Sequence, residues 1–302
     1  MAIGTTTVSA AELANMAADK PLVCGKNLVR LARVAGTTMK WCNDATPTTS
    51  STDRSATDGP ASMLGDDSST WQSYTNTTST TWWAVIDFGA TYDVDFIAIL
   101  NYNFPGVALR LDLDDASTFA TAVTAVAAGT VSASPSLRYS ILSLGAGNAR
   151  YTGVRYARVR FQTGGAAFTA KLGEIWLGKR IQLAHQPNEP WSAAAESGLV
   201  DMFESKSGAR TNYVRHAGRR IFAPEFIEHD ATALAALRTF KQDCSFGALP
   251  FLWCDKPTSD PQRFMMMHQS NPGMPERTEG PVASRFSFNG CEEIGPPFEA
   301  TE

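Results

Sequence analysis

The chain has 302 residues, of which 43% are hydrophobic, enough for a packed core in one or two domains and too many for wholesale disorder. A formal net charge of −4 provides no basic field to neutralise phosphates, so a nucleic-acid partner is not expected. The chain contains no run of about 18 apolar residues. Its first residues lack the basic and apolar regions of a secretory signal. We therefore expect neither a transmembrane helix nor a secretory signal peptide.

The first predicted element is a short helix over residues 9–19. Ser9 is placed to cap it, and Glu12 follows three residues later, which is the spacing of a capping box. Pro21 ends the helix. Residues 43–81 are rich in Thr, Ser, Asp and Gly, and we predict long loops on a scaffold there.

A series of strands follows. The predicted strands are 82–88, 96–100, 107–113, 139–144, 156–161 and 172–177. In residues 107–113 the apolar residues alternate with Arg110 and Asp112, which predicts a strand with one solvent-exposed face. In residues 156–161, Ala157, Val159 and Phe161 are predicted to face inward. This spacing of strands and Gly-rich turns predicts a β-sandwich.

The sequence pattern changes after residue 178, where the series of sandwich strands ends. A Pro-containing cluster at residues 186–190 is the preferred boundary, and strands are predicted near 213–222, 251–254, 263–268 and 285–289. One helix is predicted at 231–242, because Asp230 can cap it and apolar residues recur at helical spacing. We therefore divide the chain into an N-terminal helix and strand segment (1–45), a sandwich (46–180), a second β domain (181–295) and an extended arm (296–302).

Five phrases, in order, resemble the discoidin-type domain, also called the coagulation-factor type C domain. They are residues 60–71 (PASMLGDDSSTW), 82–89 (WWAVIDFG), 92–97 (YDVDFI), 155–160 (RYARVR) and 172–178 (LGEIWLG). The resemblance covers less than half of the chain. It implies a galactose-binding-like jelly-roll sandwich whose loops bind sugars, lipid headgroups or protein partners.

The second half looks like the tail-tube-like domains of phage tail proteins. The features are a pair of strands, the helix after Asp230, residues 247–253 (GALPFLW), and further strands. This resemblance implies a second β-sandwich with one flanking helix that assembles into rings.

The discoidin resemblance also implies a structural Ca²⁺ site, and no other cofactor is expected. Asp66, Asp67, Thr70 and Glu174 would supply side-chain oxygens, the ligand type that calcium requires. The sequence has Gly-Asp-Asp where the family more often has Asp-Gly-Asp, which displaces one carboxylate. An Asx-turn without metal is the alternative.

Aromatic and amide residues fall on predicted loops or strand ends of the sandwich. They are Trp71, Tyr74, Tyr102, Asn103 and Phe104. Apolar stacking together with directional hydrogen bonds is what a sugar-binding surface needs. The alternative for Trp71 and Phe104 is that they close the end of the sandwich core.

Five cysteines, Cys24, Cys42, Cys244, Cys254 and Cys291, follow no zinc-binding pattern. Their odd number favours reduced thiols, and a Cys24–Cys42 or Cys244–Cys254 bridge is the alternative. Nucleophile elbows, paired-histidine zinc motifs and phosphate-binding loops are missing from the sequence. We therefore predict a protein that is not an enzyme.

The first hypothesis is a structural protein of a phage tail tip or baseplate, of the distal-tail or minor-tail kind. It would assemble in the host cytoplasm into a homo-oligomeric ring, a hexamer or trimer, within the virion. It would contact neighbouring tail proteins while the sandwich projects toward a host-surface glycan. The alternatives are a glycan-binding adhesion protein and an accessory binding module of a polysaccharide-active enzyme.

Overall fold

The computed structural model describes part of the chain, and for some strand residues it describes the backbone alone. The described ranges are 3–30, 40–43, 72–75, 81–102, 108–130, 139–143, 149–162, 169–187, 194–195, 200–204, 210–214, 220–222, 224–245, 248–254, 256–259, 264–269, 276–279, 283–287 and 291–293. This part is mainly β, as predicted, and its two longer helices are α1 (Ala10–Ala17) and α3 (Ala231–Asp243).

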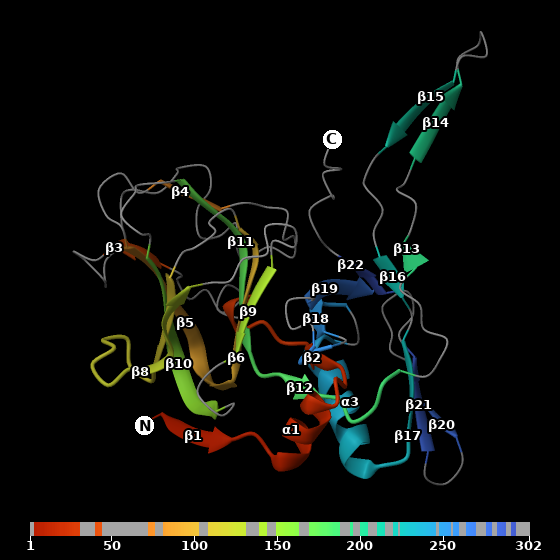
Figure 1. Ribbon diagram of the computed structural model, residues 1–302, viewed down its shortest axis with the longest axis horizontal. Helices are drawn as coiled ribbons and strands as arrows, with labels where there is room; N and C mark the ends of the chain where they lie inside the picture. The colour runs from red at the N-terminus through yellow and green to blue at the C-terminus, as the bar shows by residue number, and fades with distance from the viewer. Residues whose placement is uncertain are drawn as a thin grey trace.

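Two antiparallel sheets form a β-sandwich from the first half of the chain (Figure 1). One has the order β3-β5-β10-β7-β8, with β1 also pairing with β10. Its strands are β1 (Gly4–Thr7), β3 (Lys40–Asn43), β5 (Thr81–Val94), β7 (Ala108–Asp114), β8 (Val123–Thr130) and β10 (Ala149–Gln162). The other has the order β4-β11-β6-β9, from β4 (Gln72–Thr75), β6 (Phe96–Tyr102), β9 (Tyr139–Ser143) and β11 (Thr169–Gly178).

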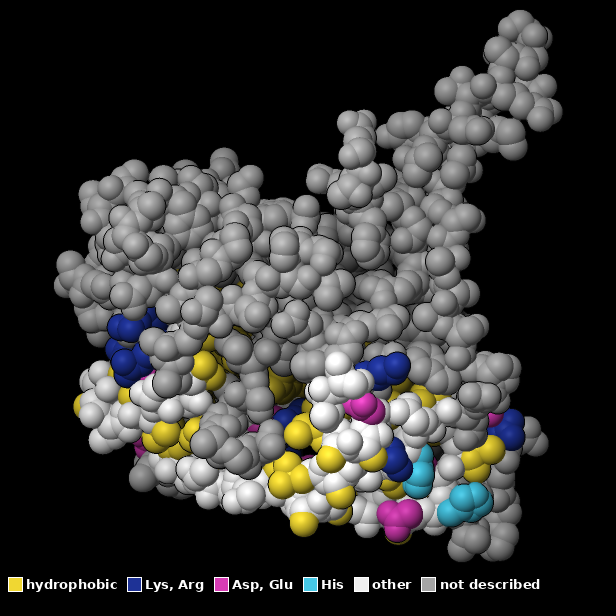
Figure 2. Space-filling view, viewed as in Figure 1, with side chains coloured by type: hydrophobic (Ala, Val, Ile, Leu, Met, Phe, Trp, Pro, Cys, Tyr) yellow, Lys and Arg dark blue, Asp and Glu magenta, His cyan; other side chains and the backbone are white. Residues whose placement is uncertain are grey.

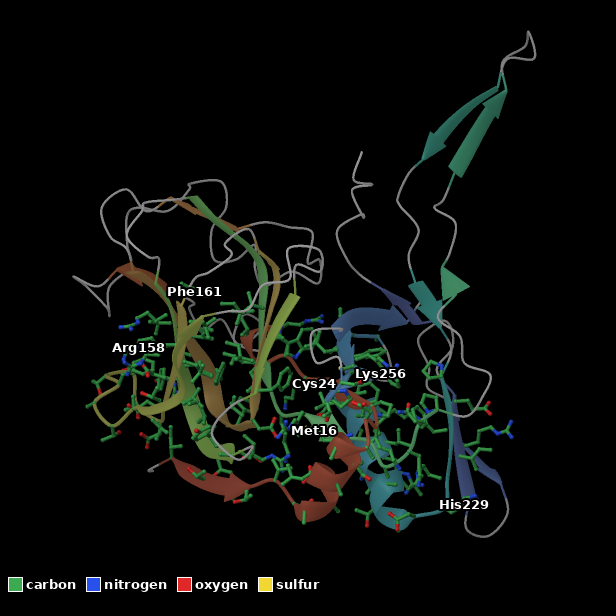
Figure 3. The ribbon with its side chains drawn as sticks, in the orientation of Figure 1. Met16, Cys24, Arg158, Phe161, His229 and Lys256 are labelled. Atoms are coloured by element: carbon green, nitrogen blue, oxygen red, sulfur yellow. The ribbon has the colours of Figure 1, made fainter. Side chains whose placement is uncertain are left out.

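The sandwich core lies between these sheets. The six-stranded sheet contributes Ile86, Leu111 and Val159, and the four-stranded sheet contributes Ile99 and Ile175. All five are buried, because alternate residues of each strand face the opposite sheet. The inward prediction for Ala157, Val159 and Phe161 is confirmed. Figure 3 shows Phe161 between the sheets and Arg158 on the outer side.

The predicted solvent-exposed face of residues 107–113 is wrong at Asp112. This side chain is fully buried, because its carboxylate accepts hydrogen bonds from Arg158 and Thr124 on the two neighbouring strands and from Arg110 on its own strand. A carboxylate on the outer side of a sheet can thus be removed from water by the polar side chains beside it.

Helix α1 begins as the sequence predicts. The Ser9 hydroxyl accepts a hydrogen bond from the Glu12 amide at 3.2 Å, and the Glu12 carboxylate accepts one from the Ser9 amide at 3.0 Å. This completes the capping box. The helix ends at Ala17, before Pro21.

The second half is built on a seven-stranded sheet that includes an N-terminal strand, β2 (Leu22–Cys24). The order is β12-β2-β18-β19-β22-β16-β13. The other strands are β12 (Ile181–Gln182), β13 (Ala194–Ala195), β16 (Arg220–Phe222), β18 (Phe251–Cys254), β19 (Phe264–Gln269) and β22 (Cys291–Glu293). The predicted boundaries after residues 45, 180 and 295 stay predictions. The pairing itself is clear: β1 joins the sandwich, and β2 joins the second sheet.

Helix α3 packs between this sheet and a smaller one. The smaller sheet has the order β17-β21-β20, from β17 (Glu225–Glu228), β20 (Glu276–Glu279) and β21 (Ala283–Ser287). Phe240 of α3 meets Phe251 of β18 edge to face, with ring centroids 5.1 Å apart. Leu237 and Phe226 lie in the same buried cluster. The predicted helix start is confirmed, because Asp230 accepts from the amides of Thr232 and Ala233 at 2.9 Å.

A separate apolar cluster joins the sandwich to the second sheet. Phe96, Ala98 and Trp176 on the four-stranded sheet pack against β2 and β18. A Cβ atom added to Gly178 would lie 2.6 Å from the Lys26 carbonyl oxygen, so the two parts touch at the backbone there. The sandwich is therefore packed against the second half and does not hang from a linker.

Strands β14 (Val200–Glu204) and β15 (Arg210–Val214) pair with each other and with no other described strand. Figure 1 shows this hairpin extending away from the rest of the molecule. Cys24, Cys244 and Cys254 are buried free thiols, so neither alternative disulfide is formed. Burial raises the pKa of Cys24 to about 12.

Among the described residues, no helix is long and apolar enough to cross a membrane.

Candidate functional site

Two of the predicted sugar-contacting positions lie on described strands. Tyr74 is in β4, opposite Ala170, and Tyr102 is the last residue of β6, opposite Leu172. Strand β11 runs between them, so two segments about 30 residues apart reach the same end of one sheet. Trp71, Asn103 and Phe104 lie outside the described residues, although each is within two residues in sequence of one of these strand ends.

The strand register also assigns a face to these positions. On β11, Ile175 and Leu177 belong to the sandwich core, whereas Trp176 belongs to the cluster on the opposite face. Alternate residues of a strand share a face, so Glu174 is on the same face as Trp176. Residues paired across neighbouring strands also share a face, which places the positions of Tyr74 and Tyr102 on the Trp176 face as well. The sequence alone did not predict this shared face.

The predicted calcium ligands are largely outside the described chain. Asp66, Asp67 and Thr70 are not described, and Glu174 is placed only by its backbone in β11, opposite Leu100. Elsewhere in the described ranges, no group of three His, Cys, Asp or Glu residues could hold a metal ion. The calcium site stays a prediction.

A buried carboxylate, Asp95, connects three parts of the chain. It accepts hydrogen bonds from Arg150 Nε at 2.9 Å and from the Arg180 amide at 2.8 Å. Arg150 also pairs with Glu12 of α1 at 3.3 Å. Burial raises the pKa of Asp95 and outweighs the opposite effect of the two arginines. This cluster fixes the junction and does not offer a free binding group.

Asp112 anchors a second cluster, on the outer side of the six-stranded sheet. Arg110 Nε donates to its carboxylate at 2.7 Å and Arg158 at 2.8 Å, and the Arg158 guanidinium lies 4.7 Å from the centre of the Phe119 ring. Figure 2 shows basic side chains gathered in the region where Figure 3 labels Arg158.

One described histidine has a carboxylate partner that the sequence did not predict. His185 Nδ1 lies 2.8 Å from the carboxylate of Glu228, which is buried in β17. The two residues are 43 positions apart, so only the tertiary fold brings them together. This pair supplies no nucleophile or metal set, and the prediction that the chain is not an enzyme stays untested.

The described residues also enclose a cavity of about 320 Å³ at the end of α3. Lys26 and Asp243 lie on its walls, and neither was singled out by sequence reasoning. Neither belongs to a recognisable motif, so no sequence signal pointed to them.

Comparisons with known proteins find similarity only at the level of solved structures. No family model and no curated protein matches the chain. A chitosan-binding module 1, derived from a chitosanase/glucanase of Paenibacillus sp. IK-5, is 14% identical with a TM-score of 0.37; the match covers 51% of this chain and 98% of that module. A pectin binding carbohydrate binding module is 9% identical with a TM-score of 0.35, covering 47% of this chain and 90% of that one.

A family 89 glycoside hydrolase from Clostridium perfringens is 13% identical with a TM-score of 0.33. That match covers 57% of this chain and 16% of the hydrolase. At these identities and TM-scores, the similarity does not extend to a ligand or a role.

Proposed function

We propose that this protein binds a glycan through the end of the sandwich that carries Tyr74 and Tyr102, and that it does so without catalysis. The observation that carries the proposal is the strand register, which brings these two tyrosine positions to the same end and the same face of one sheet. Tyrosine combines an apolar ring with a hydroxyl, so tyrosines at these two positions suit the apolar face and the hydroxyls of a sugar. The discoidin resemblance supports the same ligand class.

A glycan array probed with the purified chain tests this proposal. Tyr102→Ala and Tyr74→Ala are each expected to weaken binding by about tenfold or more, because aromatic anchors dominate such contacts. Tyr156→Ala, on the six-stranded sheet, is the matched control and should leave binding unchanged. Failure of the folded chain to bind any glycan would contradict the proposal, and so would equal binding by all three variants.

The non-catalytic part has its own test. The glycan found on the array is incubated with the chain, and new reducing ends are measured. We expect none to form. Hydrolysis that persists in repurified protein would contradict this part.

The β14–β15 hairpin favours a second candidate function, in assembly. A two-stranded hairpin is marginally stable alone in water, and this one has no other described strand beside it. We propose that it docks on neighbouring subunits, as in a ring-forming component of a phage tail tip located in the virion. Light scattering should then show a homo-oligomer that is lost when residues 200–214 are replaced by a short Gly-Ser linker. A monomer at all concentrations would contradict this.

A further inference from the structure

The cavity at the end of α3 is separate from the tyrosine-bearing end of the sandwich. It has a volume of about 320 Å³, near the lower end of the range for ligand pockets. One wall is the segment that follows Cys24 in the sequence, and Figure 3 labels Cys24 near the centre of the molecule. The other wall is the last turn of α3. Its lining is Gly25, Lys26, Asn27, Arg30, Gln242, Asp243, Ser245, Leu249 and Pro250.

Both walls of the cavity are held in place. A Cβ atom added to Gly25 would lie 2.9 Å from the Cys244 amide nitrogen, so the loop after β2 touches the end of α3 at the backbone. Asn27 donates to the Ile175 carbonyl at 3.4 Å and accepts from the Val29 amide at 3.1 Å, which ties that loop to the sandwich. The cavity is therefore built into the fold, as ligand pockets usually are.

Lys26 on one wall and Asp243 on the other carry opposite charges, and these two side chains form no ion pair with each other. Within the described part of the chain, Asp243 makes no hydrogen bond or ion pair, and the Lys26 ammonium lies 4.8 Å from the centre of the Tyr92 ring. Burial raises the pKa of Asp243 despite the nearby charges of Lys26 and Lys179. The carboxylate is thus partly desolvated and has acceptor capacity to offer a ligand.

These groups set the chemistry of the ligand. A cation would be repelled by Lys26 and Arg30, and an anion would be repelled by Asp243 and by the negative end of the α3 dipole. A neutral ligand with several hydroxyls can donate to Asp243 and accept from Lys26. Leu249 and Pro250 add an apolar wall for its C–H groups.

We propose that this cavity is a second binding site that accepts one neutral monosaccharide unit. The choice of a sugar rests partly on the proposed function, whereas the cavity and its charges do not. A ligand here would touch both α3 and the loop that is fixed to the sandwich, so it would brace the junction between the two parts.

Titration of the full chain with galactose and N-acetylglucosamine, followed by ligand-observed NMR, tests the site. We expect saturable millimolar binding, which Asp243→Ala and Lys26→Met each weaken by about tenfold. The matched controls are Glu225→Ala and Lys256→Met, a carboxylate and an ammonium outside the cavity lining. Circular dichroism and melting curves confirm that each variant is folded.

Other outcomes would overturn the proposal. If the Asp243→Ala and Lys26→Met variants bind the sugar as tightly as the native chain does, the sugar binds elsewhere. Glycine or galacturonate binding more tightly than either neutral sugar rejects the neutral ligand, and a lack of saturable binding rejects the site. Tyr102→Ala should not affect this binding. The experiment therefore distinguishes failure of the cavity proposal from failure of the proposal for the tyrosine-bearing end of the sandwich.

Discussion

Asp95 lies where the sandwich meets the start of the second sheet, and its partner Arg150 links it to helix α1. Its carboxylate is fully buried, and its partners Arg150 and Arg180 are themselves nearly buried. Two guanidinium groups would lose their shared counter-charge if this carboxylate were removed. Breaking such a buried cluster from one side costs far more than a surface pair is worth.

We therefore expect Asp95→Asn to lower the free energy of unfolding by about 3 kcal/mol. Asp93→Asn is the matched control, because the Asp93 side chain is 38% exposed and its ion pair with Lys179, at 3.2 Å, is a surface pair. The control should cost less than about 1 kcal/mol. Urea unfolding of the three proteins gives both values. Similar losses in the two variants would mean that Asp95 does not hold the junction.

Glu12 makes the stability of the folded protein depend on pH in the acid range. Burial raises its pKa, but hydrogen bonds from Ser9 and the charge of Arg150 outweigh burial and hold the pKa below its ordinary value. A lowered pKa in the folded state stabilises the protein above the unfolded pKa, and this contribution is lost as pH falls through the folded pKa. Asp95, whose pKa is raised, has the opposite dependence.

Glu12→Gln should therefore flatten the decline in melting temperature between about pH 5 and pH 3. At neutral pH the variant should be less stable than the native chain, and the two curves should converge in acid. Melting curves across this range make the comparison. Parallel curves at every pH would show that Glu12 is not responsible.

At the scale of elements, helix α3 depends on its first turn. Asp230 accepts from two amides that otherwise lack a helical partner. Asp230→Ala is expected to cost about 1 kcal/mol, whereas Asp230→Asn should retain most of the stability because Asn also caps. Urea unfolding distinguishes the two. An equal loss in both would indicate that the carboxylate acts through its charge.

The two longer helices and the main strands of the sandwich were predictable because their signals are local. A capping box, an N-cap and alternating apolar residues each act within a few positions, as at Ser9 and Asp230. Strand β2 pairs with β12 and β18, residues more than 150 positions away, and nothing in three apolar residues specifies those partners. The burial of Asp112 was likewise hidden, since it depends on side chains from neighbouring strands.

The candidate site divides in the same way. Residue type identified Tyr74 and Tyr102, since aromatic residues at strand ends are visible in the sequence. Their common face required the register of β4, β11 and β6. Lys26 and Asp243 belong to no motif, and only the packing of the loop after β2 against α3 places them around one cavity.

On the scale of the whole molecule, the junction determines whether the sandwich and the second half of the chain can move relative to each other. Trp176, Leu252 and Cys254 are buried in a cluster that contains residues from both parts. Interfaces within a chain usually permit relative motion unless they are apolar and well packed. This junction is apolar and is reinforced by the Asp95 cluster. A ligand-binding end mounted on it would keep a fixed direction relative to the second sheet.

Gly178→Ala tests this coupling directly. The added methyl group would lie 2.6 Å from the Lys26 carbonyl oxygen and 3.0 Å from Cys24 Sγ, so β11 and the loop after β2 would have to separate. The native chain should unfold in one calorimetric transition, with equal calorimetric and van't Hoff enthalpies. The variant should lose about 1–3 kcal/mol and show two transitions, because overpacking strains the contact on which coupling depends. Two transitions in the native chain, or one unshifted transition in the variant, would show that the parts fold independently of this junction.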